Sequence, residues 1–120
     1  MNKKTLVLGA SLKEDRYSNI ATKRLLNKGY DVVAVGLKNG QVAGVRIEIG
    51  TPFFEGVDTV TLYLNPKRQA SFYDYVLSLH PKRVIFNPGT VNYEFKEILE
   101  KHSIYTEVAC TLVLLATNQY

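Results

Sequence analysis

Residues Lys4 to Lys28 read KTLVLGASLKEDRYSNIATKRLLNK, and this stretch decides the fold. Its apolar start, Thr5 to Leu8, predicts a buried strand that stops at Gly9, and Ser18 is expected to cap a helix over the residues that follow it. A buried strand that turns at a glycine into a helix is typical of a nucleotide-binding α/β unit. The free N–H groups and the positive dipole end of such a helix favour a phosphate. A tight strand–helix turn without any ligand is the alternative interpretation.

The residues around this turn have the chemistry that a phosphate requires. Gly9 has no Cβ, so the backbone there can turn sharply and approach a ligand closely. Ser11 adds a hydroxyl, and Arg16 adds a fork of N–H donors. The full dinucleotide fingerprint has three glycines, and here only Gly9 occupies such a position, with Ala10 and Ser11 after it. The turn alone therefore does not decide between a ligand site and a purely structural turn.

Length and composition predict one globular domain over residues 1–120, with 46% hydrophobic and 22% charged residues. No stretch reaches the roughly 20 apolar residues of a membrane span, and Met1 to Lys4 run directly into the first strand without a visible targeting segment. We therefore expect a cytoplasmic protein that does not bind membranes. The net charge of +4 is mild and its cations are spread along the chain, so we expect no nucleic-acid binding. The single cysteine, Cys110, has no ligand-like spacing with the two histidines, which predicts no metal site.

Beyond the first unit, apolar runs alternate with helical patterns along the chain. We expect four further strands, at residues 31–35, 59–64, 83–86 and 104–108. Their almost unbroken apolar character is typical of strands that are covered on both faces. Asn65-Pro66 is the clearest helix start, and Asn92 is expected to cap the next helix. The pattern therefore predicts an α/β domain with a doubly wound, mainly parallel five-stranded sheet and helices on both faces.

Three segments are less clear in this alternation. Residues Gln41 to Ile49 fit either a small hairpin that turns near Ala43-Gly44 or an irregular crossover. Thr51-Pro52 is typical of a cap followed by a first-turn proline, which predicts a short helical turn. The apolar tail from Cys110 to Thr117 fits either a last helix or an extended segment.

In a doubly wound sheet, ligands bind outside the carboxyl ends of the strands, where the strand order switches. This rule brings the loops at residues 9–18, 36–39, 64–68 and 87–90 into one crevice. The loops contain only two carboxylates, Glu14 and Asp15, against five cations. These cations are Lys13, Arg16, Lys38, Lys67 and Arg68. We therefore expect an electropositive crevice that suits a phosphorylated ligand.

The end of the second strand narrows the choice of ligand. An NAD site has an acidic residue just past this strand to hold the ribose hydroxyls. Here Gly36-Leu37-Lys38 occupy that place, and Asp31 lies at the opposite end of the strand. NAD is therefore disfavoured. A ligand with an extra phosphate near Lys38, such as CoA with its 3′-phosphate or NADP, remains open.

Several segments match one known family in the family's own order. They are Gly9-Ala10-Ser11 with Arg16 and Ser18, Gly29-Tyr30-Asp31-Val32, Leu62 to Pro66, Asn87-Pro88-Gly89, Asn92-Tyr93-Glu94 and Cys110. Together they resemble the small stand-alone CoA-binding proteins, which are similar to the CoA-binding domain of the succinyl-CoA synthetase alpha subunit. The resemblance covers nearly the whole chain and implies a Rossmann-like fold with CoA or a related nucleotide in the crevice.

The resemblance also implies a site. It places Gly9, Ala10, Ser11 and Arg16 around the pyrophosphate and Lys38 opposite the adenosine phosphate. Tyr17 is the residue we consider for stacking on the base. The family usually has Asn-Pro after the second strand, where this chain has Gly36-Leu37. The complete set of expected cofactor-binding residues is Gly9, Ala10, Ser11, Arg16, Tyr17, Ser18, Gly36, Leu37, Lys38, Leu64, Asn65, Pro66, Asn87, Pro88 and Gly89.

No catalytic constellation is visible. The catalytic histidine of the related synthetase lies in a separate domain, and Ser11 has no histidine nearby to activate it. His80 is expected opposite the crevice, and His102 and Cys110 are expected in the core. We therefore expect a non-catalytic module that binds CoA or an acyl-CoA as a sensor or carrier. The alternatives are an NADP(H)-binding module or redox sensor, and a ligand-free interaction protein that self-associates through Leu112 to Ala116.

Overall fold

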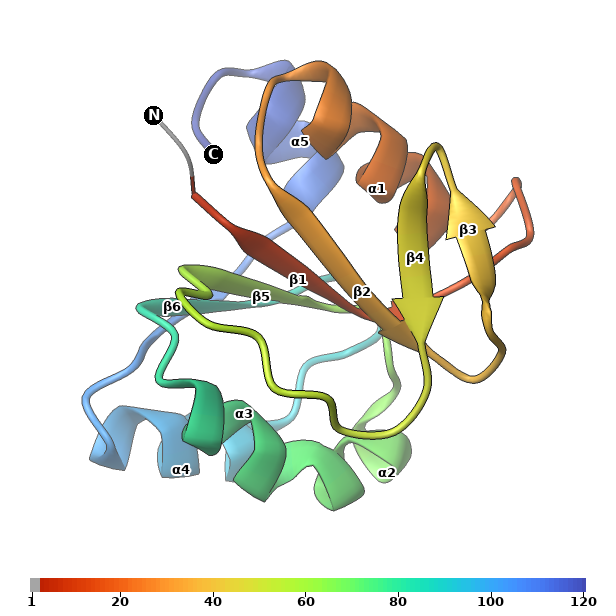
Figure 1. Ribbon diagram of the computed structural model, residues 1–120. Helices are drawn as coiled ribbons and strands as arrows, with labels where there is room; N and C mark the ends of the chain where they lie inside the picture. The colour runs from red at the N-terminus through yellow and green to blue at the C-terminus, as the bar shows by residue number, and fades with distance from the viewer. Residues whose placement is uncertain (1–2) are drawn as a thin grey trace.

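The computed structural model describes residues 3–120 and has one seven-stranded sheet at its centre, with helices on both faces (Figure 1). The strand order is β3-β4-β2-β1-β5-β6-β7, and every neighbouring pair is parallel except β3 and β4. The strands are β1 (Thr5–Ala10), β2 (Val32–Gly36), β3 (Gly40–Val42), β4 (Val45–Glu48), β5 (Thr59–Leu62), β6 (Arg83–Phe86) and β7 (Tyr105–Val108). The helices are α1 (Tyr17–Asn27), α2 (Pro66–Gln69), the 3-10 turn η1 (Ala70–Phe72), α3 (Tyr73–Leu79), α4 (Tyr93–Lys101) and α5 (Thr111–Ala116).

The doubly wound α/β fold with a mostly parallel sheet is confirmed, but the predicted number of five strands is wrong. The two additional strands are the β3–β4 hairpin. Its turn residues Ala43 and Gly44 have φ angles of 51° and 86°, the left-handed conformation that two-residue hairpins favour. Strand β4 then pairs in parallel with β2, and its buried Ile47 sits opposite Ala34. Of the two interpretations of this segment, the hairpin is therefore the right one, and pairing with β2 adds it to the sheet.

Strand β1 shows why these strands are apolar on both faces. Leu6 and Leu8 point into the core layer under α3 and α4, which also holds Phe95 of α4. Val7 points into the opposite layer under α1 and α5, together with Leu25 of α1. Because successive side chains of a strand alternate between faces, a central strand buried on both sides needs an unbroken apolar run.

Two of the predicted helix caps are confirmed by the structure. Asn65 and Asn92 cap α2 and α4 as expected, because their side chains accept the backbone N–H groups of Arg68 and Phe95. Helix α1, however, begins at Tyr17 with Arg16 as its extended N-cap residue, so the expected cap at Ser18 is wrong.

Two further expectations are corrected by the structure, and one is resolved. Residues 51–54 form no helical turn, and the hydroxyl of Tyr75 donates to the carbonyl of Pro52. His102 is exposed at the end of α4 rather than buried, with its Nδ1 2.9 Å from the Ile98 carbonyl. The apolar tail forms the helix α5.

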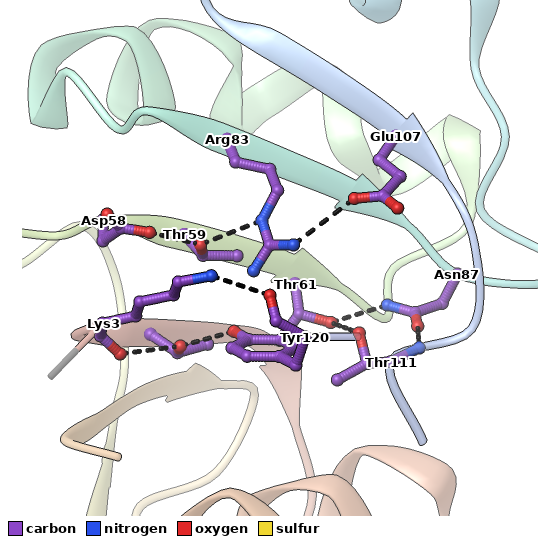
Figure 2. A network of polar contacts seen from close by, with 10 residues as sticks. Lys3, Asp58, Thr59, Thr61, Arg83, Asn87, Glu107, Thr111 and Tyr120 are labelled. Carbon is purple, nitrogen blue, oxygen red and sulfur yellow. Dashed lines mark hydrogen bonds and ion pairs between the residues drawn. The ribbon is translucent and has the colours of Figure 1, made fainter. Parts of the chain in front are cut away.

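The amino ends of the strands are tied together by the last residue (Figure 2). The ring of Tyr120 lies under the Arg83 guanidinium, 4.5 Å from its carbon atom, and its hydroxyl shares a hydrogen bond with Thr5. Lys3 Nζ donates to the Tyr120 carbonyl over 2.7 Å. Arg83 also pairs with Glu107 of β7 at 3.3 Å. These contacts join β1, β6 and β7 at the end of the sheet that lies away from the loops after β1 and β5.

We expect Tyr120→Ala to lower the free energy of unfolding by about 3 kcal/mol, because the ring is buried in the core layer under α1 and α5 and packs against Tyr30. Tyr120→Phe keeps the ring and loses only the hydrogen bond, so its cost is about 1 kcal/mol. Urea unfolding of both variants measures the difference. Equal losses in the two variants would show that the ring contributes nothing beyond its hydroxyl.

Candidate functional site

A cleft of about 680 Å³ opens at the carboxyl ends of β1, β2 and β5. The chain passes from β1 to β2 on one side and later to β5 on the other side of β1, so the strand order switches direction here. This is the position at which ligands bind in open α/β sheets. The cleft has a volume in the range of ordinary small-molecule sites.

The cleft collects most of the predicted residues, but not all of them. Nine of the expected cofactor-binding residues line it: Gly9, Ala10, Ser11, Arg16, Gly36, Leu37, Lys38, Leu64 and Asn65. The lining does not include Tyr17, Ser18, Pro66, Asn87, Pro88 or Gly89. It does include two of the cations expected in the crevice, Lys13 and Arg68, and six residues that the sequence did not assign to it as binding residues: Leu8, Leu12, Val35, Tyr63, Ser71 and Phe72.

Asn87 shows why the loop after β6 does not line the cleft as expected. Its side chain is buried and donates to the hydroxyl of Thr61 over 2.7 Å and to the carbonyl of Leu62 over 2.9 Å. Its Oδ1 accepts the N–H of Thr111, the first residue of α5, over 2.8 Å (Figure 2). The side-chain amide of Asn87 therefore fixes α5 to the sheet, and both its nitrogen and its oxygen are hydrogen-bonded within the protein.

The charge of the cleft is uniformly positive. Lys13, Arg16, Lys38 and Arg68 line it, while none of its lining residues within residues 3–120 is an aspartate or a glutamate. The ion pairs found in this described part of the chain involve other cations, Arg83 and Lys96. Lys67 is exposed and lies outside the lining, so four of the five expected cations meet here. Like charges that converge without a counter-charge suit an anionic ligand.

Helix α1 adds a further positive element next to the cleft. Its N-cap residue, Arg16, lines the cleft, and within the described chain its first turn has no acidic residue and no capping side chain. Among the described residues, the first turn of the helix therefore contains no carboxylate or capping side chain that offsets the positive end of the helix dipole. Asn19 holds the preceding loop in place, because its Nδ2 donates to the Ser11 carbonyl over 2.9 Å.

Two glycines let the loops around the cleft approach one another. Gly9 has a φ of +100°, and a Cβ there would lie 2.9 Å from the backbone carbon of Tyr63. A Cβ on Gly36 would lie 2.3 Å from the carbonyl oxygen of Ala10. The sequence indicates Gly9 as a place where a ligand approaches the backbone. The close approach that the structure shows is to the loop after β5.

Tyr63 is one of the residues that line the cleft, and its hydroxyl is buried inside the protein. Burial raises the pKa of Tyr63 to about 12, because the charged phenolate would lose its hydration. The neutral form is therefore the one that the folded protein stabilises.

Comparisons with known proteins agree with this geometry. A family model described as a CoA binding domain matches residues 3–116. The chain belongs to the CoA-binding domain family. No curated protein matches it significantly.

Similar solved structures share the CoA-binding domain's architecture over nearly the whole chain. One uncharacterized protein is 50% identical and has a TM-score of 0.97, covering 100% of this chain and 99% of its own. A hypothetical protein from Pyrococcus horikoshii OT3 is 25% identical with a TM-score of 0.86, covering 98% of this chain and 83% of its own. A conserved hypothetical protein from Pyrococcus furiosus is 26% identical with a TM-score of 0.81, covering 92% of this chain and 97% of its own.

Two other kinds of functional feature are absent from the described residues. Residues 3–120 contain no group of three or more His, Cys, Asp and Glu side chains placed to hold a metal ion. Among the helices of that same stretch, none has both the length and the apolar character needed to cross a bilayer.

We expect Gly9→Ala to destabilise the free protein more than Gly50→Ala. Both glycines have positive φ, +100° and +84°, so an alanine strains the backbone at both positions by about 1 kcal/mol. A Cβ on Gly50 would have no atom within 4 Å, whereas one on Gly9 meets backbone atoms, which adds roughly 1–3 kcal/mol. Urea unfolding in the absence of ligand measures both losses. Equal losses would show that the loops can separate at no cost.

The raised pKa of Tyr63 predicts how the stability of the protein changes at alkaline pH. Since its pKa is about 12 in the folded state against 10 ordinarily, its contribution to stability is present below pH 10 and is lost as the pH rises toward 12. In Tyr63→Phe the fall in the free energy of unfolding between pH 10 and 12 should be smaller by roughly 2 kcal/mol. Urea unfolding at each pH tests this, and parallel curves for the two proteins would contradict it.

Proposed function

We propose that the cleft binds CoA or an acyl-CoA and that the protein acts without catalysis, as a sensor or carrier in the cytoplasm. The observation that carries the proposal is the convergence of Lys13, Arg16, Lys38 and Arg68 in one cleft that has no carboxylate in its described lining. CoA carries a pyrophosphate and a separate 3′-phosphate, so it presents anionic groups at two places. Family membership supports CoA over other phosphorylated ligands.

The positions of the cations suggest how the ligand lies. Arg16 and the start of α1 suit the pyrophosphate, because they combine a charged fork of donors with the positive end of a helix dipole. Lys38 follows β2 and suits the 3′-phosphate of the adenosine. Leu37 beside it is 68% exposed, which leaves an apolar surface near the adenosine end.

The non-catalytic part of the proposal is supported by the composition of the cleft. Its lining within residues 3–120 contains no His, Cys, Asp or Glu that would act as a base or nucleophile. His80 and His102 are exposed outside it. Ser11 accepts the Lys13 N–H over 3.1 Å and has no histidine among the described lining residues to activate it.

The self-association proposal has less support. Leu114 and Leu115 of the apolar tail are buried in the protein's own core, which leaves Val113 as the large apolar residue of α5 that is exposed. An open interface would require an apolar face that the fold leaves uncovered. The apolar residues of the tail therefore pack mainly into the core of this chain.

Thermal unfolding in the presence of CoA, acetyl-CoA, NADP, NAD and ATP tests the choice of ligand. A ligand at about a hundred times its dissociation constant stabilises the fold by about 2.7 kcal/mol. We expect CoA and acetyl-CoA to raise the melting temperature and NAD to leave it unchanged. A rise with NADP alone would favour the NADP(H) module, and no rise with any ligand would favour an interaction protein.

We expect Arg16→Ala and Lys38→Ala each to weaken CoA binding about tenfold or more, because a hydrogen bond to a charged group contributes about 1.5–3 kcal/mol. Lys101→Ala is the matched control, since Lys101 is an exposed cation at the end of α4, outside the cleft. Isothermal titration calorimetry gives the affinities, and urea unfolding confirms that the free proteins are intact. Unchanged affinity in both cleft variants would place the ligand elsewhere.

A further inference from the structure

We propose that Gly40 sets the shape of the cleft from outside it, by giving the side chain of Leu12 a place to sit against β3. The inference rests on the proposed function, since it concerns the affinity of the same cleft for CoA. It makes Gly40 a positioning residue. Leu12 lines the cleft, whereas Gly40 is not among its described lining residues.

The contact between the two residues is unusually close. A Cβ on Gly40 would lie 2.5 Å from Cδ2 of Leu12, 2.9 Å from its Cδ1 and 3.2 Å from its Cγ. Side chains do not approach one another to such distances, so Leu12 occupies the space that any other residue at position 40 would fill. The contact joins the loop after β1 to the outermost strand of the sheet, and Figure 1 shows this red-orange loop running beside β3.

The geometry also shows which partner would move. The atoms of Leu12 that lie close to Gly40 are the far end of a flexible side chain, which can change rotamer at small cost. Gly40 is not among the glycines with positive φ, so its backbone accepts an alanine. Substitution of Gly40 by alanine therefore displaces Leu12 and does not strain the strand.

The displacement matters because Leu12 is itself part of the lining of the cleft. Leu12 is 42% exposed, and it belongs to the loop that also contributes Ser11, Lys13 and Arg16 to the cleft. When an alanine at position 40 displaces the Leu12 side chain, that side chain either enters the cleft and narrows it, or turns to solvent, so that the cleft loses an apolar wall. Both results weaken ligand binding, and both act only through Leu12.

A double-mutant cycle on the full chain tests this coupling. We expect Gly40→Ala alone to raise the Kd for CoA about tenfold, which is typical of a change of one methylene-sized group in a binding pocket. In a Leu12→Ala background, Gly40→Ala should change the Kd less than about twofold, because the displaced atoms are gone. Gln41→Ala is the matched control, since Gln41 is the next residue of β3 and its side chain is exposed.

Dephospho-CoA separates this effect from electrostatics. Gly40→Ala should weaken CoA and dephospho-CoA equally, whereas Lys38→Ala should weaken CoA more. An unchanged Kd for Gly40→Ala, or the same loss in both Leu12 backgrounds, would overturn the inference.

The contact is also measurable without any ligand. Methyl NMR of the free protein should show the Leu12 methyl resonances shifted by Gly40→Ala and unshifted by Gln41→Ala. If the wild-type protein binds no CoA but these shifts appear, the proposed function fails and the Leu12–Gly40 contact stands. If the Leu12 resonances do not respond to Gly40→Ala, the inference fails whatever the ligand is.

Discussion

The closeness of the backbones around β1 is the constraint on which the rest of this structure depends. At Gly9 and Gly36 a single Cβ would collide with a neighbouring main chain, at 2.9 Å from Tyr63 and 2.3 Å from Ala10. These two positions therefore let the loop after β1 approach the loop after β5, and the end of β2 approach β1. Because the loops start from such close strand ends, their side chains face one common space rather than three separate surfaces.

The positive charge gathered in this cleft destabilises the free protein and favours the binding of an anion. Four cations and an uncompensated helix N-terminus repel one another, and the described lining has no carboxylate to offset them. The cost is modest because the cationic side chains are exposed and screened by solvent. An anionic ligand in the cleft would offset this repulsion.

The polar contacts of Tyr120 and the cleft proposed to bind the ligand are located at opposite ends of the same sheet. At the amino ends, Tyr120, Arg83 and Lys3 tie the strands together with polar contacts (Figure 2). At the carboxyl ends, loops with exposed side chains form the cleft. The β3–β4 hairpin is the element that connects the edge of the sheet to the cleft, through the contact of Gly40 with Leu12.

Local chemistry was enough to predict the strand–helix alternation and the caps at Asn65 and Asn92, because each depends on neighbours in sequence. The positive charge of the crevice was predicted from the rule that the loops after parallel strands meet at one edge of the sheet. Other features depend on partners far along the chain, and no local pattern reports them. The hairpin is part of the sheet only because β4 pairs with β2. Asn87 does not line the cleft because its side chain is hydrogen-bonded to Thr61 and Thr111. The place of Leu12 against Gly40 likewise depends on two segments that meet only when the sheet forms.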